Sequence, residues 1–350
     1  MTAPLSETDG AELRDVGDGV YAYLQRDGSW GWSNAGLVTS RGDAMLVDTL
    51  YDLNLTRRML DTMRRRTPDA ANIETVVNTH ANGDHCWGNQ LVGGAEIVAS
   101  RRAADEMRDL SPALMKTLVR ASRLAVGAGA GARWAANLLA RLGVTRATSF
   151  ADAARFVVEK FGVFDFEGIE LCPPTTTFDG ALTVTVGDKA VHLIEVGPAH
   201  TRGDAIVHVP ADRIVFSGDI LFVGSHPVVW EGPVENWIGA CDRILALDVD
   251  TIVPGHGPVT DKAGVSRVKE YWVYLLAETR DRFEAGMSAD EAARDIALGG
   301  FSGWLDAERV AVNVDTIYRD LSGDRSKRDP LQALARMALL LEEREGRAKR

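Results

Sequence analysis

The stretch NTHANGDH, residues 78–85, decides how this sequence is interpreted. It continues the short apolar segment IETVV, residues 73–77, which predicts a β-strand, and its Asn and Gly predict a tight loop after the strand. Imidazole and carboxylate groups are the ligands that bind zinc and similar divalent ions, and strand ends hold such groups more rigidly than free loops do. His80, Asp84 and His85 therefore predict one part of a metal site.

Three later segments repeat this design of an apolar strand followed by a tight turn with His or Asp. They are GPAHTRGD with His200, FSGD with Asp219 and PGHGP with His256. Each segment alone has a simpler explanation, because a single His after a strand is usually structural and Asp-Gly pairs commonly form turns. Together, the four segments predict one metal centre built from separated parts of the chain.

In this order the motifs resemble those of the metallo-β-lactamase fold superfamily, whose signature H-x-H-x-D-H is followed by a distant His, a bridging Asp and a last His. The resemblance spans roughly residues 16–261 and includes Asp48, where the family has a buried aspartate. It implies an α/β fold, a four-layer αββα sandwich with the metals at one edge. It also implies the metal-ligand positions His80, Asn82, Asp84, His85, His200, Asp219 and His256.

Asn82 departs from the family pattern, because it stands where the second His of the signature is expected. An amide oxygen is a poorer ligand than an imidazole nitrogen for a borderline metal. The resemblance leaves the first metal only His80, His200 and Asp219 as other protein ligands. The second metal keeps Asp84, His85, Asp219 and His256, so we expect the second site to bind more tightly.

The expected chemistry is hydrolysis by a water that the metal activates, since a bound divalent cation lowers the pKa of water from 15.7 toward about 7. We expect zinc, as one or two ions, with iron or manganese as alternatives. Asp84 and Asp219 are the predicted catalytic residues, because they would hold or orient this water. The expected substrate is a small, partly apolar molecule with an ester-like bond: a lactone, thioester or carboxylic ester.

Four aromatic or imidazole side chains are predicted to contact the substrate. Trp30 and Trp32 lie in the loop SWGWSN, which in the resembling family overhangs the metals, and His226 and Trp230 follow Asp219. The alternative for the two loop tryptophans is burial against the sheet. The alternative for His226 is a structural histidine held by the turn at the proline that follows it.

The chain is predicted to comprise a catalytic domain, residues 10–261, and a C-terminal helical region, residues 262–350. Strand signals dominate the first domain, except for an amphipathic helix over residues 54–66 and a helical insertion over about residues 100–167. The C-terminal pattern predicts helices over 262–283, 289–297 and 307–321 and a charged last helix. These helical regions could form a lid over the site or bury the interface of a homodimer.

Composition excludes several classes of function. With 39 basic and 50 acidic side chains, the net charge of −11 argues against nucleic acid as a partner. The sequence has neither a basic segment followed by an apolar one at its N-terminus nor a run of about 18 apolar residues, so we expect no export and no membrane partner. Three separated cysteines encode no disulfide framework, and together these features predict a cytoplasmic protein.

Two other functions compete with hydrolysis. His80, His200 and Asp219 form a set of two histidines and one carboxylate, which suits a non-haem iron oxygenase acting on a sulfur or organic substrate. A non-catalytic metal-binding homologue is the third candidate, with the first metal lost through Asn82. β-Lactam hydrolysis is disfavoured, because the secreted enzymes of that kind carry an export signal.

Overall fold

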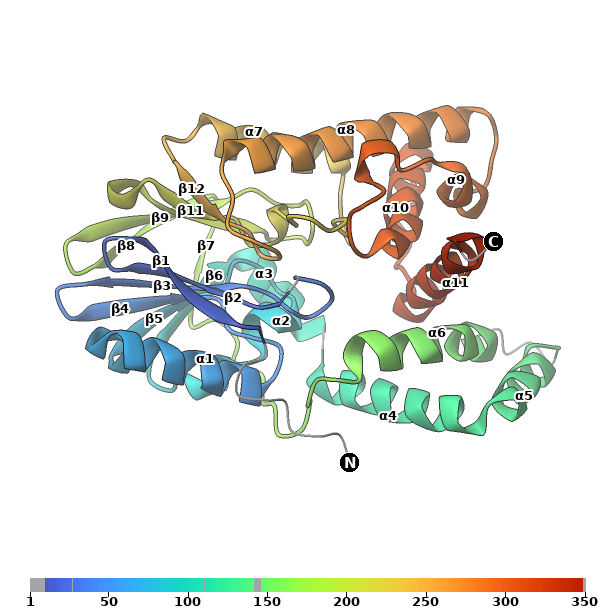
Figure 1. The fold of residues 1–350 in the computed structure, drawn as a ribbon, viewed down its shortest axis with the longest axis horizontal. Coiled ribbons are helices and arrows are strands. Elements are labelled where there is room, and N and C mark those ends of the chain that lie inside the picture. The colour runs from blue at the N-terminus through green and yellow to red at the C-terminus, as the bar shows by residue number, and fades with distance from the viewer. Residues whose placement is uncertain (1–9, 27, 110, 142–145, 349–350) are drawn as a thin grey trace.

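The computed structural model describes residues 10–26, 28–109, 111–141 and 146–348. Two β-sheets face each other, and helices cover their outer faces (Figure 1). This arrangement confirms the predicted α/β sandwich.

The first sheet begins with an antiparallel meander and continues with parallel strands. Its seven strands follow one another in sequence order: β1 (Glu12–Gly17), β2 (Val20–Leu24), β3 (Ala35–Ser40), β4 (Asp43–Val47), β5 (Ile73–Val77), β6 (Glu96–Ser100) and β7 (Thr176–Phe178). Strands β4 to β7 run parallel, so their carboxyl ends meet at one edge of the sheet. Asp48 and His80 follow β4 and β5 and therefore lie at this edge.

The second sheet is mostly antiparallel. Its five strands are β8 (Ala181–Val186), β9 (Lys189–Glu195), β10 (Ala205–Val209), β11 (Ile214–Phe216) and β12 (Thr251–Val253). Their spatial order is β12-β11-β10-β9-β8, and only β11 and β12 are parallel. Asp219 and His256 come directly after this parallel pair, which brings them to the same end of the second sheet.

Side-chain alternation along the strands separates two cores. In β3, Val38 belongs to the core between the sheets, and its neighbour Leu37 belongs to the larger core beneath the helices. In β4, Met45 and Leu46 divide in the same way. This is the period of two that a strand imposes when both faces are buried.

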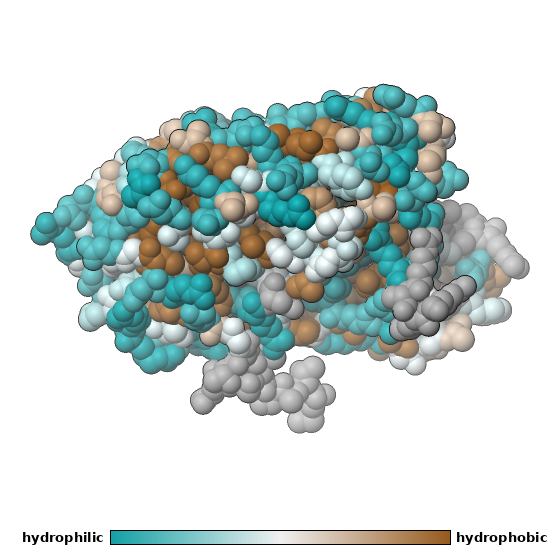
Figure 2. Space-filling model, turned by 45° about the horizontal axis from the view of Figure 1, so that its top comes forward, coloured by the Kyte–Doolittle hydropathy of each residue, from teal (hydrophilic) through white to brown (hydrophobic). Residues whose placement is uncertain are grey.

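The outer layers are α1 (Leu53–Arg66) on the first sheet and α7 (Val234–Ala246) with α8 (Lys262–Glu284) on the second (Figure 1). Helix α1 begins where the Asp52 side chain accepts a hydrogen bond from the Leu55 N–H, at 2.7 Å. Helix α8 buries the rings of Tyr271 and Trp272. On the face of the molecule shown in Figure 2, hydrophilic residues cover much of the surface with apolar patches between them.

The remaining helices lie at one end of the sandwich or at the ends of strands (Figure 1). They are α2 (Gly83–Cys86), α3 (Arg101–Glu106), α4 (Pro112–Ala128), α5 (Ala130–Arg141), α6 (Arg146–Phe161), α9 (Ala289–Asp295), α10 (Val310–Ser322) and α11 (Pro330–Ala348). Short 3-10 turns add η1 (Pro68–Ala71), η2 (Asn89–Leu91), η3 (Met107–Asp109), η4 (Pro210–Asp212), η5 (Gly218–Ile220), η6 (Gly299–Phe301) and η7 (Ala307–Arg309). The insertion helix α6 and the C-terminal helix α11 pack against each other.

The C-terminal helices share the large core with the sandwich. Trp272 of α8 packs on Trp237 of α7, with ring centroids 4.6 Å apart, and Val310 and Val314 of α10 belong to the same buried cluster. Among the described residues, none of the helices has the length and apolarity that a membrane crossing requires.

Candidate metal centre

The predicted ligands meet at one end of the sandwich, where the loops after β5, β9, β11 and β12 converge. Asp219 in η5 is the centre of the group: its Oδ2 lies 3.3 Å from His200 Nε2 and 3.4 Å from His256 Nε2. Asp219 Oδ2 is also 3.7 Å from His80 Nε2, and its Oδ1 is 3.1 Å from His85 Nε2. The structure thus brings four imidazoles from separate segments around one buried carboxylate.

Asp84 completes the group from helix α2, with its Oδ2 3.4 Å from His256 Nε2. Its side chain is 12% exposed, whereas that of Asp219 is 2% exposed. The histidine side chains of the group are at most 3% exposed. The group therefore reaches solvent mainly beside Asp84.

Hydrogen bonds at Nδ1 turn the Nε2 atom of each histidine toward the group. His256 Nδ1 donates to the Gly28 carbonyl at 2.9 Å, and His200 Nδ1 donates to the Val228 carbonyl at 2.6 Å. His85 Nδ1 donates to Asp48 Oδ2 at 2.9 Å. A neutral imidazole with its proton on Nδ1 presents an unprotonated Nε2, which is the form that binds a metal.

Asp48 also sets the orientation of His80. The Thr79 hydroxyl donates to Asp48 Oδ2 at 2.7 Å and lies 3.0 Å from His80 Nδ1, so it is free to accept the proton of that nitrogen. The Thr79 N–H donates to the other oxygen of Asp48 at 2.7 Å. One buried carboxylate thus fixes two histidines, a role that outer residues commonly play around metals.

Several buried polar atoms of the group lack hydrogen bonds among the described residues. They are His80 Nε2, His85 Nε2 and Asp219 Oδ1. Leaving such atoms unpaired is costly unless another partner satisfies them. The ligand atoms of His80, His85 and Asp219 lie within 4.8 Å of one another, as do those of Asp84, His85 and His256. Histidine and carboxylate donors at this spacing fit a divalent cation.

The protonation states in this group follow from burial and charge. Burial lowers the pKa of His80 and of His200, so both rings are neutral at pH 7. Burial alone would raise the pKa of Asp219, but the surrounding histidines hold it well below its usual range. Burial would lower the pKa of His256, but the charge of Asp219 raises it to about 9. A metal cation would therefore replace a proton at His256.

Asn82 bonds to a neighbouring histidine of the group. Its Nδ2 lies 2.9 Å from His200 Nε2. An amide NH₂ can only donate, and His200 already uses its Nδ1 proton on Val228, so Asn82 donates to the lone pair of His200 Nε2. The same lone pair would have to bind the first metal.

Two glycines allow the backbone to approach the group closely. A Cβ at Gly255 would lie 2.0 Å from Asp219 Oδ1, and a Cβ at Gly28 would lie 2.2 Å from the backbone nitrogen of Gly257. Gly28 also has a φ of +73°, which side chains rarely adopt. Both positions therefore require glycine.

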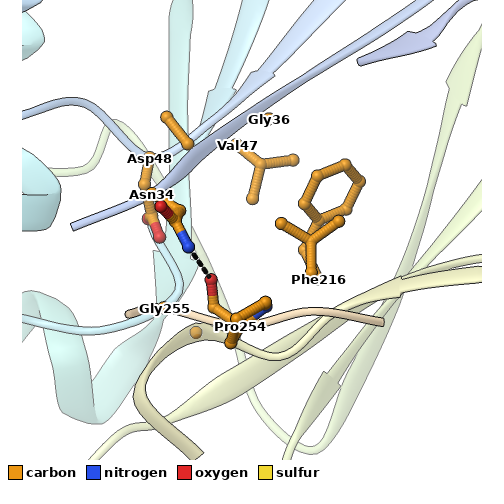
Figure 3. A pocket seen from close by; sticks show the side chains of 10 residues that line it. Asn34, Gly36, Val47, Asp48, Phe216, Pro254 and Gly255 are labelled. Atoms are coloured by element: carbon orange, nitrogen blue, oxygen red, sulfur yellow. Dashed lines mark hydrogen bonds between the residues drawn. The ribbon is translucent and has the colours of Figure 1, made fainter. Parts of the chain in front are cut away.

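A small cavity lies between the sheets beside Asp48 and Gly255 (Figure 3). Val47 and Phe216 line its apolar side, and Asn34 donates to the Pro254 carbonyl at 2.9 Å across it. None of the histidines of the group lines this cavity, so it is separate from the candidate metal centre.

The structure separates the four residues predicted to contact substrate. Trp30 and Trp230 lie together, with ring centroids 6.3 Å apart, whereas Trp32 packs against Phe164 at 4.9 Å. Both loop tryptophans are buried. This burial is the alternative that the sequence left open.

His226 lies in the packing between the sandwich and the C-terminal region. Its ring is fully buried between Tyr271 and Trp304, with centroid distances of 5.2 and 5.8 Å. Burial lowers the pKa of His226 to about 3, which keeps the ring neutral. His226 therefore packs against residues of α8 and of the segment before η7. Neither of these packing partners belongs to the histidine–aspartate group.

Sequence reasoning did not find the residues that hold the two carbonyls bonded to His200 and His256. Asn313 and Arg309, from the C-terminal region, contact the loop of Val228, and Asp306 contacts the loop of Gly28. No local motif marks them. Arg309 and Asn313 are polar residues within the predicted helix over 307–321, whereas Asp306 precedes that helix and carries no such signal.

A family model described as the metallo-beta-lactamase superfamily matches residues 28–256. Among curated proteins, the chain is 30% identical over 123 residues to the 2,4-dinitroanisole O-demethylase subunit alpha of Nocardioides sp. (strain JS1661). It is 27% identical over 94 residues to the acyl-coenzyme A thioesterase MBLAC2 of Bos taurus. It is 33% identical over 76 residues to the hydroxyacylglutathione hydrolase of Rhizobium meliloti (strain 1021).

These matches are partial. They cover 35%, 25% and 20% of this chain, and 38%, 33% and 30% of the relatives in the same order. The chain thus spans only about a third of the length of each relative.

Solved structures share the fold at low identity. The sec-alkylsulfatase Pisa1 from Pseudomonas sp. superposes with a TM-score of 0.60 at 14% identity, over 91% of this chain and 52% of that chain. A metallo-beta-lactamase from Pontibacter korlensis superposes with a TM-score of 0.51 at 16% identity, over 75% of this chain and 99% of that chain.

Proposed function

Since the chain belongs to the metallo-beta-lactamase superfamily, we propose that it is a metal-dependent hydrolase of an ester-like bond in a small, partly apolar substrate. The observation that carries this proposal is the convergence of four Nε2 atoms and two carboxylates at one end of the sandwich. His80 Nε2, His85 Nε2 and Asp219 Oδ1 are buried without hydrogen bonds among the described residues, and a bound cation would satisfy them. A carboxylic ester, a thioester and a lactone are the proposed substrate classes.

Zinc is the proposed metal, because imidazole and carboxylate donors suit it. Asp84, His85, Asp219 and His256 would hold one ion firmly. His80, His200 and Asp219 would hold a second ion weakly, since Asn82 competes for the lone pair of His200. A bound divalent cation supplies a water of lowered pKa and polarises a carbonyl oxygen.

Asp84 is the proposed residue that orients the water and accepts its proton. It is the member of the group whose side chain is most exposed, so the reacting bond would approach beside it. The charge and hydrogen bond of His256 hold the pKa of Asp84 below its usual value, although burial opposes this shift. Asp84 is therefore an ionised carboxylate at neutral pH, which can accept a hydrogen bond from water.

The basic side chains near the site are paired with carboxylates, which favours a substrate with an uncharged reacting group over a sulfate ester. Among the described cations near the loops of the site, Arg202, Lys160 and Arg309 are paired with carboxylates. Arg202 pairs with Asp109 at 2.6 Å, Lys160 pairs with Glu308 at 3.3 Å, and Arg309 pairs with Asp306 at 3.1 Å. A cation already neutralised by a carboxylate offers little to an anionic substrate. The thioesterase and the hydroxyacylglutathione hydrolase among the relatives agree with an acyl substrate.

The iron oxygenase alternative needs His80, His200 and Asp219 as a ligand set with open positions. The hydrogen bond from Asn82 to His200 Nε2 weakens that set, and the second group around His85 would have no role in it. Hydrolysis uses both groups. The structure therefore supports the hydrolase better.

Substrate screening with defined metals tests the proposal. The metal-free chain, reloaded with zinc, manganese or iron, is assayed with aryl esters, acyl thioesters, lactones and sulfate esters. We expect zinc-dependent cleavage of at least one carbonyl substrate and none of the sulfate esters. His85→Ala should abolish it, whereas the matched control His192→Ala, on β9, should retain it. Full activity without bound metal, or oxygen uptake with iron alone, would contradict the proposal.

A further inference from the structure

Two backbone carbonyls orient metal ligands, and both lie in loops that the C-terminal region holds. We infer that the segment 306–316, with Asn313 and Asp306 as its main contacts, positions His200 and His256 for metal binding. This inference rests on the metal centre of the proposed function. It assigns the C-terminal region a role in the site, beyond covering the core.

Asn313 of α10 holds the loop that carries the Val228 carbonyl. Its Nδ2 donates to the Pro227 carbonyl at 2.8 Å, and its Oδ1 accepts from the Val229 N–H at 2.9 Å. Its side chain is fully buried. Thr316, one turn later, donates to the Val229 carbonyl at 2.9 Å. One helix therefore holds the chain on both sides of Val228.

This pairing explains the direction of the Val228 carbonyl. In an extended chain, the carbonyl of one residue and the N–H two residues later point to the same side, and the carbonyl between them points to the opposite side. Asn313 bonds to one side of this segment, at the Pro227 carbonyl and the Val229 N–H. The Val228 carbonyl is thereby turned toward His200 Nδ1, at 2.6 Å.

Asp306 holds the other loop, which carries the Gly28 carbonyl. Ser29, the next residue, donates its hydroxyl to Asp306 Oδ1 at 2.8 Å. Trp30 donates its indole N–H to Glu308 at 2.9 Å. The Gly28 carbonyl, fixed in this way from the following residues, accepts from His256 Nδ1 at 2.9 Å.

Arg309 connects the two loops. Its Nη1 donates to the His226 carbonyl at 2.8 Å, and its guanidinium lies 4.3 Å from the ring centroid of Trp30. It also lies 5.1 Å from the ring of Phe222, which stacks on His256 at 4.8 Å with an interplanar angle of 4°. An arginine that is fully buried, paired with Asp306 and placed between the two loops keeps them in one arrangement.

A purely structural role would make a different prediction. If Asn313 only fills the core, removing it would lower the stability of the protein and leave the affinity of the folded protein for metal unchanged. If it positions His200, metal affinity falls by more than the loss of stability explains, as happens when outer residues of metal sites are mutated. Metal binding and stability are therefore measured separately.

The experiment compares Asn313→Ala with Val314→Ala in the full chain. Val314 is the matched control, because it is equally buried on the same helix and its side chain forms no hydrogen bond. Cobalt affinity is measured by competition with a chelator, the visible spectrum of the cobalt protein reports ligand geometry, and the thermal midpoint of the metal-free protein reports stability. We expect Asn313→Ala to lose about 10-fold or more in affinity, with a changed spectrum. Val314→Ala should keep both.

Ser29→Ala tests the second loop, because it removes the hydroxyl that donates to Asp306. We expect cobalt affinity to fall by several-fold, whereas Ser40→Ala, which removes a hydroxyl bonded to Asp188 at the surface, leaves it unchanged. Equal affinities for wild type, Asn313→Ala and Ser29→Ala would overturn the positioning role. A wild-type chain that binds cobalt but hydrolyses no substrate would contradict the proposed activity alone. A wild-type chain that binds no cobalt would overturn both.

Discussion

Asp48 lies beneath the metal centre and bonds to two of its histidines, directly to His85 and through Thr79 to His80. Its backbone adopts a φ of +62°, a left-handed conformation that aspartate tolerates better than most residues. This turn aims its carboxylate back at the loop after β5. A residue outside the predicted ligand set therefore determines how two candidate ligands present their Nε2 atoms.

We predict that Asp48→Asn weakens metal binding. The amide cannot accept hydrogen bonds at both of its ends, and an NH₂ group at the Oδ2 position removes the acceptor of both His85 Nδ1 and the Thr79 hydroxyl. We expect metal affinity to fall by about 10- to 100-fold, measured by chelator competition. Asp52→Asn is the control, since Asp52 is equally buried but caps helix α1 and touches none of the histidines. An equal loss of affinity in both variants would contradict the assignment.

Asn82 is the residue that distinguishes this centre from the family signature. We predict that Asn82→His increases the amount of zinc bound per chain, because the new imidazole adds a ligand and frees His200 Nε2 from its hydrogen bond. Metal analysis of the purified variant measures the ratio. Asn82→Ala, which frees His200 without adding a ligand, should raise the ratio less than Asn82→His does. Unchanged zinc in Asn82→His would show that Asn82 does not control the first site.

The candidate metal centre is formed by loops that follow the ends of strands. The loops after β11 and β12 lie side by side because those strands are parallel neighbours, and Gly255 allows Asp219 to lie against the second loop. The side chain of Asn34 donates to the carbonyls of Pro254 and Gly257, which ties the loop after β12 to the first sheet. The position of Asp219 thus depends on both sheets.

We predict that Gly255→Ala disrupts the candidate metal centre. The added methyl group would lie 2.0 Å from Asp219 Oδ1 and 2.7 Å from the backbone of Gly218, so the carboxylate has to move. We expect a stability loss of about 1–3 kcal/mol, measured by denaturant unfolding, together with loss of bound metal. Gly239→Ala in helix α7, where a Cβ meets no atom within 4 Å, should be neutral or stabilising.

The whole molecule is held together by contacts between regions that are far apart in the sequence. Lys160 of the insertion pairs with Asp306 and Glu308 of the C-terminal region, and both of these carboxylates also contact the Ser29–Trp30 loop. Helix α8 buries Tyr271 and Trp272 in the core that lies beneath α7. The sandwich and the helical region are therefore expected to unfold together.

We predict that a chain ending at residue 261 does not fold cooperatively. Removing α8 would expose the apolar faces of Trp237 and of the helix that carries it, and removing Asn313 would release the loop of Val228. Circular dichroism on heating, with the full chain as reference, measures the transition. A shortened chain with a sharp transition and wild-type cobalt affinity would contradict both this prediction and the positioning role of the C-terminal segment.

Much of the architecture could be predicted from local sequence. Alternating and continuous apolar runs between turn residues indicated the strands, and the apolar spacing of residues 54–66 indicated helix α1, which the structure places at Leu53–Arg66. The predicted C-terminal helix over 262–283 corresponds to α8. These patterns are readable because each element buries one face, and the position of that face is recorded in the residues of the element itself.

The sequence alone determined which side chains could serve as metal ligands, because each lies at the end of a strand in a short motif whose chemistry needs no distant partner. Only the tertiary structure decided how those side chains are oriented. The carbonyls of Gly28 and Val228 hold His256 and His200, and a carbonyl oxygen is common to every residue, so no residue type marks it. Its direction depends on packing against Asp306 and Asn313, more than 80 residues away in the sequence, and such a contact exists only in the folded chain.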